Sequence, residues 1–168
     1  MIRQATEKDA FEIEKIDREA FGKGGITQTM IRSQLNVFPD GAFVAVQGKK
    51  VVGVAFCEQH QKRLFPPYVH DVGRTHSDKG KLFYLSVITI SKKFRSKGIG
   101  SMLLKAIDKL ADSSGGQRIY CPVNKLHPYL KEGVLHFWEK NAYQITGETS
   151  WEVAPGKYLK SYIFEKVI

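Results

Sequence analysis

A strand-like run, a basic turn that contains two glycines and an amphipathic helix follow one another between residues 81 and 110. Residues 81–90 read KLFYLSVITI, a composition rich in aromatic and β-branched residues that predicts a central strand. After the turn, apolar residues recur at helical spacing from Ile99 to Leu110. A strand followed by a helix of this kind needs a sheet on which the helix can pack, so we predict a mixed α/β domain.

The rest of the chain shows the same mixture of helical and strand-like patterns. We expect helices over residues 10–21, 27–35 and 131–140, and strands over residues 1–5, 42–47, 50–59, 118–123, 143–153 and 158–167. Gly48 and Lys49 form a tight turn, which makes the strands on either side of it an antiparallel hairpin. With 168 residues, no internal repeat and no obvious linker, the chain is expected to form one domain over residues 1–168.

The net charge of the chain is +9, and almost all of it lies in one part of the sequence. Residues 61–105 contain ten Lys or Arg and only two acidic residues, whereas the rest of the chain is nearly neutral. A basic segment this concentrated indicates an anionic partner, which could be nucleic acid, an acidic membrane surface or a phosphorylated small molecule.

Two features favour a soluble, cytoplasmic protein without a membrane partner. The N-terminal residues have no apolar core of the kind found in secretory signals. The longest apolar run, residues 51–57, is far shorter than the roughly 20 residues of a membrane-spanning helix. Cys57 and Cys121 lie in separate strand-like runs, so we expect two buried free thiols.

The turn before the helix that begins near Ile99 is suited to binding an anion. The first amides of a helix have no intrahelical partner and lie at the positive end of its dipole. Gly98 and Gly100 remove two side chains there, and Arg95 and Lys97 add positive charge, so a phosphate could reach the backbone. The patterns of a P-loop and of a dinucleotide-binding turn are both absent from the sequence. The turn therefore favours a diphosphate or a phosphate ester.

The six residues Arg95-Ser96-Lys97-Gly98-Ile99-Gly100 match the Arg/Gln-x-x-Gly-x-Gly/Ala signature of the GNAT N-acetyltransferases, and they lie, as in that family, between the central strand and the following helix. Residues 2–6, 51–55 and 137–143 resemble the family's opening strand and helix start, its third strand and its late helix-to-strand stretch. Together these matches span nearly the whole chain. The resemblance implies a GNAT-like α/β fold in which about four helices flank a central, mostly antiparallel sheet of six or seven strands.

The resemblance also implies acetyl-CoA as the acetyl donor. Backbone amides of the signature would hold its pyrophosphate, and the backbone of the central strand would pair with its pantetheine arm. A CoA-contacting asparagine of the family falls at His127 here, with Asn124 three residues earlier. The residues predicted on this basis to bind CoA are Ile88, Thr89, Ile90, Arg95, Ser96, Lys97, Gly98, Ile99, Gly100, Ser101, Asn124 and Phe137. Because CoA is a polyanion, the basic segment agrees independently with this donor.

Acetyl transfer to an amine needs a deprotonated amine, a polarised thioester carbonyl and a proton for the departing thiolate. The glutamate base of many family members aligns with Ser86, which could hold a water that relays the proton. The tyrosine that often protonates the thiolate aligns with Trp138, which has no ionisable proton. His127 or Tyr129, in a loop longer than usual, could replace this acid, or both could be surface loop residues. Ser86, His127 and Tyr129 are therefore the candidate catalytic residues.

Residues 60–80 form a second candidate site. They contain His60, His70 and His76 among prolines and aromatic residues. The spacing of these histidines fits no standard ligand motif, and no thiolate accompanies them, so we expect no metal site. A long segment of this kind predicts a flexible lid over the acceptor pocket.

Three functions are compatible with these patterns. The first is an acetyl-CoA-dependent N-acetyltransferase, in which a primary amine of a small molecule or a peptide attacks the thioester directly. The second is a nucleic-acid-binding module built on residues 92–97, which the glycines disfavour because phosphate-backbone binding needs charge alone. The third is an acyl-CoA-binding sensor without turnover, suggested by Ser86 and Trp138. The closing strands, 143–153 and 158–167, could pair across a homodimer.

Overall fold

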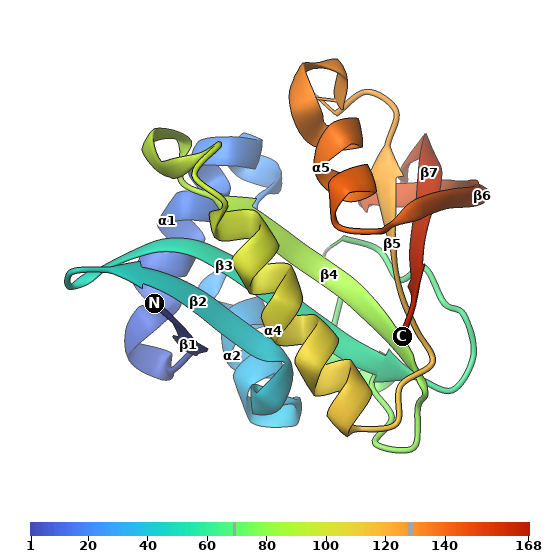
Figure 1. Cartoon of the computed structure of the whole chain (residues 1–168), viewed down its shortest axis with the longest axis horizontal. Helices are drawn as coiled ribbons and strands as arrows, with labels where there is room; N and C mark the ends of the chain where they lie inside the picture. Colours follow the sequence, from blue (N-terminus) through green and yellow to red (C-terminus); the bar gives the residue numbers. More distant parts are fainter. Residues whose placement is uncertain (69, 128–129) are drawn as a thin grey trace.

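A seven-stranded sheet crosses the molecule and carries helices on both faces (Figure 1). The computed structural model describes residues 1–68, 70–127 and 130–168. The strands are β1 (Ile2–Gln4), β2 (Ala42–Gln47), β3 (Lys50–His60), β4 (Leu82–Ile90), β5 (Arg118–Asn124), β6 (Gln144–Ala154) and β7 (Lys157–Val167). The helices are α1 (Ala10–Phe21), α2 (Gln28–Val37), α3 (Val72–Thr75), α4 (Ile99–Ser113) and α5 (Leu135–Lys140). The strand order is β1-β2-β3-β4-β5-β7-β6, and of the described strand pairs only β4–β5 is parallel.

This architecture confirms the predicted mixed α/β fold with a mostly antiparallel sheet. The described residues form five helices where about four were expected, because the short α3 lies within residues 60–80. The helix predicted over residues 131–140 is shorter than expected. Its first half is the π-helical turn Leu130–Val134, which contains Gly133 at φ +138°, so α5 begins only at Leu135.

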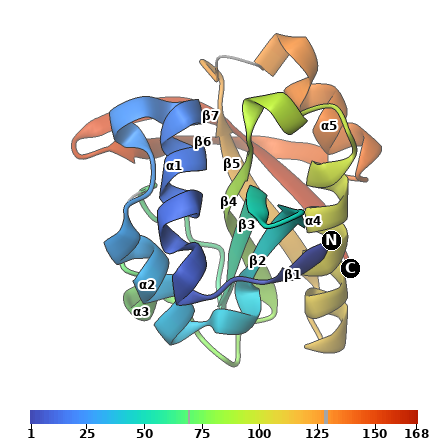
Figure 2. The same ribbon diagram turned by 90° about the vertical axis from the view of Figure 1, so that its left-hand side faces the viewer.

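The helices are placed by their apolar faces. Helices α1 and α2 cover one face of the sheet, and α4 and α5 lie on the other (Figure 2). Leu103 and Ile107 of α4 are fully buried in the cluster on its face, and Ile13 of α1 and Ile31 of α2 are fully buried in the cluster on the opposite face. The helical spacing of apolar residues in the sequence therefore indicates which side of each helix packs against the sheet.

The two cysteines and the lengths of the helices bear on two expectations drawn from the sequence. Cys57 and Cys121 are both buried free thiols, as predicted. None of the helices in the described parts of the chain is long and apolar enough to cross a membrane.

Strand β4 has nine residues and loses its β5 partner after the third. Its first three residues, Leu82–Tyr84, pair with β5, and the described register contains no pair between these two strands after Tyr84. On the other side, the register with β3 shifts between Phe56 and Cys57, which leaves Ser86 of β4 as an extra, bulged residue. A bulge bends its strand and increases the local twist. Strands β4 and β5 consequently diverge toward the end of β4 (Figure 1).

Two residues of the segment that follows β3, Pro66 and Tyr68, are hydrogen-bonded to β6. The indole N–H of Trp151 donates to the Pro66 carbonyl at 2.8 Å, and the backbone N–H of Tyr68 donates to the Glu152 carbonyl at 3.0 Å. The segment was expected to be a flexible lid. In the structure its described residues on either side of position 69 are hydrogen-bonded to the sheet, and Tyr68 lies beside the diverging strands.

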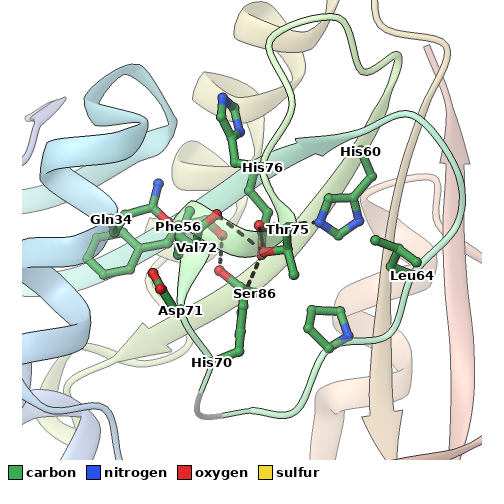
Figure 3. A network of polar contacts seen from close by, with 12 residues as sticks. Gln34, Phe56, His60, Leu64, His70, Asp71, Val72, Thr75, His76 and Ser86 are labelled. Carbon is green, nitrogen blue, oxygen red and sulfur yellow. Dashed lines mark hydrogen bonds and ion pairs between the residues drawn. The ribbon is translucent and has the colours of Figure 1, made fainter.

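A buried carboxylate, Glu58 of β3, fastens the same segment to the sheet, and Figure 3 labels its partners His60, His70 and Thr75. Its Oε1 lies 2.5 Å from His70 Nε2, and its Oε2 lies 2.5 Å from Thr75 Oγ1 and 3.3 Å from His60 Nε2. Burial alone would raise the pKa of Glu58, but these partners outweigh burial and lower the pKa to about 2. The network extends further into the sheet because His60 Nδ1 lies 2.6 Å from the Tyr120 hydroxyl.

The ionised Glu58 should therefore stabilise the fold in a pH-dependent way. The folded-state pKa of about 2 is below the ordinary value of 4.5, so the stabilisation is complete above about pH 4.5 and is lost as the pH falls toward 2. A shift of this size corresponds to about 3 kcal/mol of unfolding free energy. We expect Glu58→Gln to lower the unfolding free energy at pH 7 by an amount of this order, and the deficit to shrink below pH 4.5, in urea titrations at a series of pH values.

The matched control is Glu19→Gln, at an exposed position of α1. Its unfolding free energy should stay within about 0.5 kcal/mol of wild type at each pH. A Glu58→Gln protein as stable as wild type at pH 7 would show that the network does not fasten the segment.

Candidate active site

The diverging ends of β4 and β5 border a cleft of about 760 Å³. Its lining comes from both faces of the sheet, since Phe94 and Phe137 lie on the α4 and α5 side, and Phe21, Tyr68 and Trp151 lie on the α1 side. All but one of the residues predicted to bind CoA line this cleft, namely Ile88, Thr89, Ile90, Arg95, Ser96, Gly98, Ile99, Gly100, Ser101, Asn124 and Phe137. Positions far apart in the sequence thus meet at one site.

The remaining predicted residues are placed as follows. Lys97 is not part of the cleft lining, and its Nζ lies over the Phe94 ring, 5.3 Å from the centroid. Ser86 and His127 do line the cleft. The third catalytic candidate, Tyr129, lies outside the described residues.

One end of the cleft is the start of α4. Gly98 precedes the helix with φ +78°, in the left-handed region, and no described side chain caps the helix. The first helical hydrogen bond runs from Met102 N to Gly98 O at 3.1 Å, so the amides of the three residues before Met102 have no intrahelical acceptor. The first turn of α4 contains no acidic residue. Amide donors and the positive end of the dipole therefore face the cleft together.

The two glycines of the turn are required for different reasons. A Cβ on Gly98 would meet no atom within 4 Å, so the position is open, and its positive φ is what requires glycine. A Cβ on Gly100 would lie 2.8 Å from Cε2 of Phe137, so that position is required for packing against α5. Gly98 therefore leaves the backbone open to approach, as the sequence predicts, whereas Gly100 makes room for the Phe137 ring in the wall of the cleft.

A buried aspartate supports β4 from the α1 side. Asp17 is fully buried and accepts from Thr89 Oγ1 at 2.6 Å, from the Tyr68 hydroxyl at 2.8 Å and from Ile26 N at 2.8 Å. Burial raises the pKa of Asp17, and the three hydrogen bonds counteract part of that rise. This one carboxylate therefore joins α1, the central strand and the segment that carries Tyr68.

Sequence reasoning did not single out Asp17 as a support of the site, and it included Tyr68 only as part of the segment 60–80 predicted to cover the acceptor pocket. Asp17 falls on the apolar stripe of α1 together with Ile13 and Ile16, which is where a charged residue is least expected. That position was the available signal, because carboxylates are almost never fully buried without partners. Its partner Tyr68 is 51 residues away in the sequence, and no pattern connects the two.

The catalytic candidates lie in different settings. The hydroxyl of Ser86 donates to the Phe56 carbonyl at 3.3 Å. The His127 ring makes an edge contact with Phe21, with ring centroids 5.9 Å apart. Burial, together with the charge of Arg95, lowers the pKa of His127 below its ordinary value. Trp138 is buried, stacks on Phe164 and lines the cleft, and its indole has no ionisable proton to transfer.

The histidines of residues 60–80 do not form a metal site in the part of the chain that the structure describes. No group of three or more His, Cys, Asp or Glu side chains there could hold a metal ion. His60 and His70 contact Glu58, and His76 Nδ1 accepts from the backbone N–H of Gln59 at 3.1 Å.

Comparison with known proteins agrees with this geometry. The model of the acetyltransferase (GNAT) family matches residues 10–143, whereas no curated protein sequence matches the chain significantly. The loading GNATL domain of CurA from Lyngbya majuscula has a TM-score of 0.82 at 14% identity, over 99% of this chain and 96% of that one. The GphF GNAT-like decarboxylase, solved with isobutyryl-CoA, has a TM-score of 0.75 at 13% identity, over 99% and 98%. An aminoglycoside 6'-N-acetyltransferase, solved with coenzyme A, has a TM-score of 0.70 at 14% identity, over 99% and 96%.

At these identities the solved structures establish the shared fold, and the family match extends from α1 through α5 to Tyr143, just before β6. It includes the uncapped start of α4, the bulged strand β4 and the cleft residues between them. The chain belongs to the GNAT acetyltransferase family.

Proposed function

We propose that the protein is an acetyl-CoA-dependent N-acetyltransferase that moves an acetyl group to a primary amine of a small molecule or a peptide. The observation that carries this proposal is the uncapped, glycine-led start of α4, which opens into the cleft between β4 and β5. A phosphate-bearing donor fits such a helix start, and an acceptor can reach the same cleft from the other face of the sheet.

The donor half of the site suits CoA. The open position at Gly98 lets a pyrophosphate approach the unpaired amides of α4, and Arg95 stands at the same end of the cleft. Beyond Tyr84, the edge of β4 that faces β5 has no strand partner in the described register. The Ile90 carbonyl accepts from Arg95 Nε at 3.1 Å, and the backbone before Ile90 can pair with an extended pantetheine arm. The CoA and isobutyryl-CoA ligands of two structural neighbours support this assignment.

Direct attack by the amine is favoured over an acetylated enzyme. Cys121 is the thiol in the cleft lining, and burial raises its pKa so far that it stays protonated at neutral pH. In direct transfer the amine nitrogen attacks the thioester carbonyl carbon, the carbon–sulfur bond breaks, the nitrogen loses one proton and the thiolate takes one. A backbone N–H of β4 can polarise the carbonyl.

Two histidines line the cleft, and we assign the role of proton acceptor to His127, because it is partly buried beside Arg95 whereas His136 is exposed on α5. Because its pKa is lowered, its imidazole is neutral at pH 7, and a neutral imidazole accepts a proton. This favours the role of base over the role of acid considered from the sequence. Trp138 cannot give a proton to the departing thiolate, and we assign this role to none of the described residues. An acyl-CoA-binding sensor without turnover is therefore the alternative that experiment must exclude.

The direct test is to incubate the protein with acetyl-CoA and a panel of primary amines and to measure release of the CoA thiol. We expect release that depends on an amine, with acetylated amine as the product by mass spectrometry. Tight CoA binding without release for any amine would favour the sensor. Absence of CoA binding would contradict the proposal as a whole.

The start of α4 predicts a charge-selective effect at Gly98. Gly98→Glu places a carboxylate where a phosphate should lie, and we expect the dissociation constant for CoA to rise at least about 100-fold in calorimetry. Gly98→Ala adds a side chain in open space and strains a positive φ, so it should cost about 1 kcal/mol of stability and leave CoA binding within about tenfold. Wild-type affinity in the glutamate variant would refute the phosphate site.

The pKa of His127 should respond to its cationic neighbour. Arg95→Gln removes the charge that opposes protonation of the ring, so the pKa should rise toward the ordinary 6.5, while the part caused by burial remains. Lys97→Gln removes an equal charge, which lies over Phe94 and is not among the causes of the His127 shift, and should leave the pKa nearly unchanged. A side-chain NMR titration, with His127→Gln used to assign the signal, measures both. Equal shifts in the two variants would contradict the assigned cause.

A further inference from the structure

A second, much smaller cavity adjoins the cleft on the α1 and α2 side of the sheet. Its volume is about 20 Å³, and it shares Tyr68, Ser86 and Val87 with the lining of the cleft. Four polar side chains contribute to its wall, namely Gln34, Tyr68, His70 and Ser86, and the other lining residues are apolar. A cavity needs roughly 10–15 Å³ to hold a water molecule, so this one accommodates a single water-sized group.

Every donor on these four side chains already has an acceptor elsewhere. Gln34 Nε2 donates to the carbonyls of Phe38 at 2.9 Å and Cys57 at 3.0 Å, which uses both of its hydrogens and fixes the orientation of the amide. The Tyr68 hydroxyl donates to Asp17. The cavity wall therefore has no hydrogen to offer from these two residues.

The donors of Ser86 and His70 are also directed at acceptors outside the cavity. The Ser86 hydroxyl donates to the Phe56 carbonyl, and the ring nitrogens of His70 face the Pro67 carbonyl at 2.9 Å and Glu58 Oε1 at 2.5 Å. Both nitrogens of His70 are thus directed at acceptors outside the cavity. A carboxylate, a phosphate or a carbonyl oxygen would find no donor among these side chains.

The polar side chains that line the cavity therefore offer it hydrogen-bond acceptors. Gln34 is almost completely buried, and its Oε1 has no hydrogen-bond partner among the described residues. Ser86 Oγ has lone pairs that its donated bond does not use. A buried hydrogen-bond acceptor without a partner destabilises the fold by roughly 1–3 kcal/mol. A small hydrogen-bond donor beside Gln34 Oε1 would remove this cost, and Figure 3 labels Gln34 and Ser86.

We propose that this cavity binds one water molecule, which donates its hydrogens to Gln34 Oε1 and Ser86 Oγ and presents its lone pair to the cleft. There it accepts a hydrogen bond from the acceptor amine. The inference rests on the proposed function, because it states which group of the amine substrate the site recognises, namely its N–H. Gln34 and Ser86 are positioning residues that act through the water.

Filling the cavity tests the proposal without removing a polar group. Val72→Ile adds one methylene group to the apolar wall and should exclude the water. Val46→Ile is the control, a partly buried valine that packs against the core cluster containing Ile26, Phe56 and Val87 of the cavity wall but does not itself line the cavity. We expect Val72→Ile and Ser86→Ala each to lower kcat/KM for the amine about tenfold, as loss of one positioning hydrogen bond does, with the dissociation constant for CoA within about twofold of wild type. The control should stay at the wild-type value.

The double variant separates a shared water from unrelated damage. If both changes act through one water, Val72→Ile with Ser86→Ala should be no slower than either single variant, because the second change removes nothing further. Multiplied losses, or wild-type kcat/KM in both single variants, would overturn the proposal.

A crystal structure of the wild-type protein gives a readout that does not depend on activity. We expect a solvent peak within hydrogen-bonding distance of Gln34 Oε1 and Ser86 Oγ, and its loss in Val72→Ile. No peak, or replacement of the peak by methylamine when crystals are soaked in that amine, would overturn the water site. Should the protein acetylate no amine at all, the proposed function fails, and this structure still decides the water site separately.

Discussion

The organisation of the site depends on one interruption of the sheet. Strands β4 and β5 share three residue pairs and then separate, while β4 stays paired with β3 through the bulge at Ser86. A continuous ladder would have used the backbone groups of both strands and filled the space between them. Separation leaves one edge of β4 available and creates a cleft that reaches both faces of the sheet. The helix start at Gly98 is useful only because this space lies in front of it.

Two buried carboxylates hold together the elements on the α1 side of that cleft. Asp17 joins α1 to β4 and to Tyr68, and Glu58 joins β3 to the histidine and threonine of the segment that follows it. A fully buried carboxylate is unfavourable unless donors surround it, so each of these positions fixes several elements at once. This arrangement explains why a segment with the composition of a mobile loop is hydrogen-bonded to the sheet.

The parts of the fold that local pattern determines could be predicted from the sequence. The apolar stripe of α4, the hairpin of β2 and β3 and the glycine at the helix start each depend on residues close together in the chain. Gln34, Asp17 and Tyr68 could not be assigned, because their partners lie on other elements and their roles depend on tertiary contacts. Lys97 fits the family signature but points onto Phe94, since a signature fixes the backbone more closely than it fixes a long side chain.

The lining of the cleft by both faces of the sheet has a kinetic consequence. In the proposed reaction the donor would enter past Gly98 and Phe137 and the amine past Phe21 and Tyr68, so the two would reach the same cleft from different faces of the sheet. Neither has to leave before the other arrives. For the proposed reaction this corresponds to a ternary complex and to intersecting lines in a double-reciprocal plot, because the acetyl group passes between two ligands that are present together.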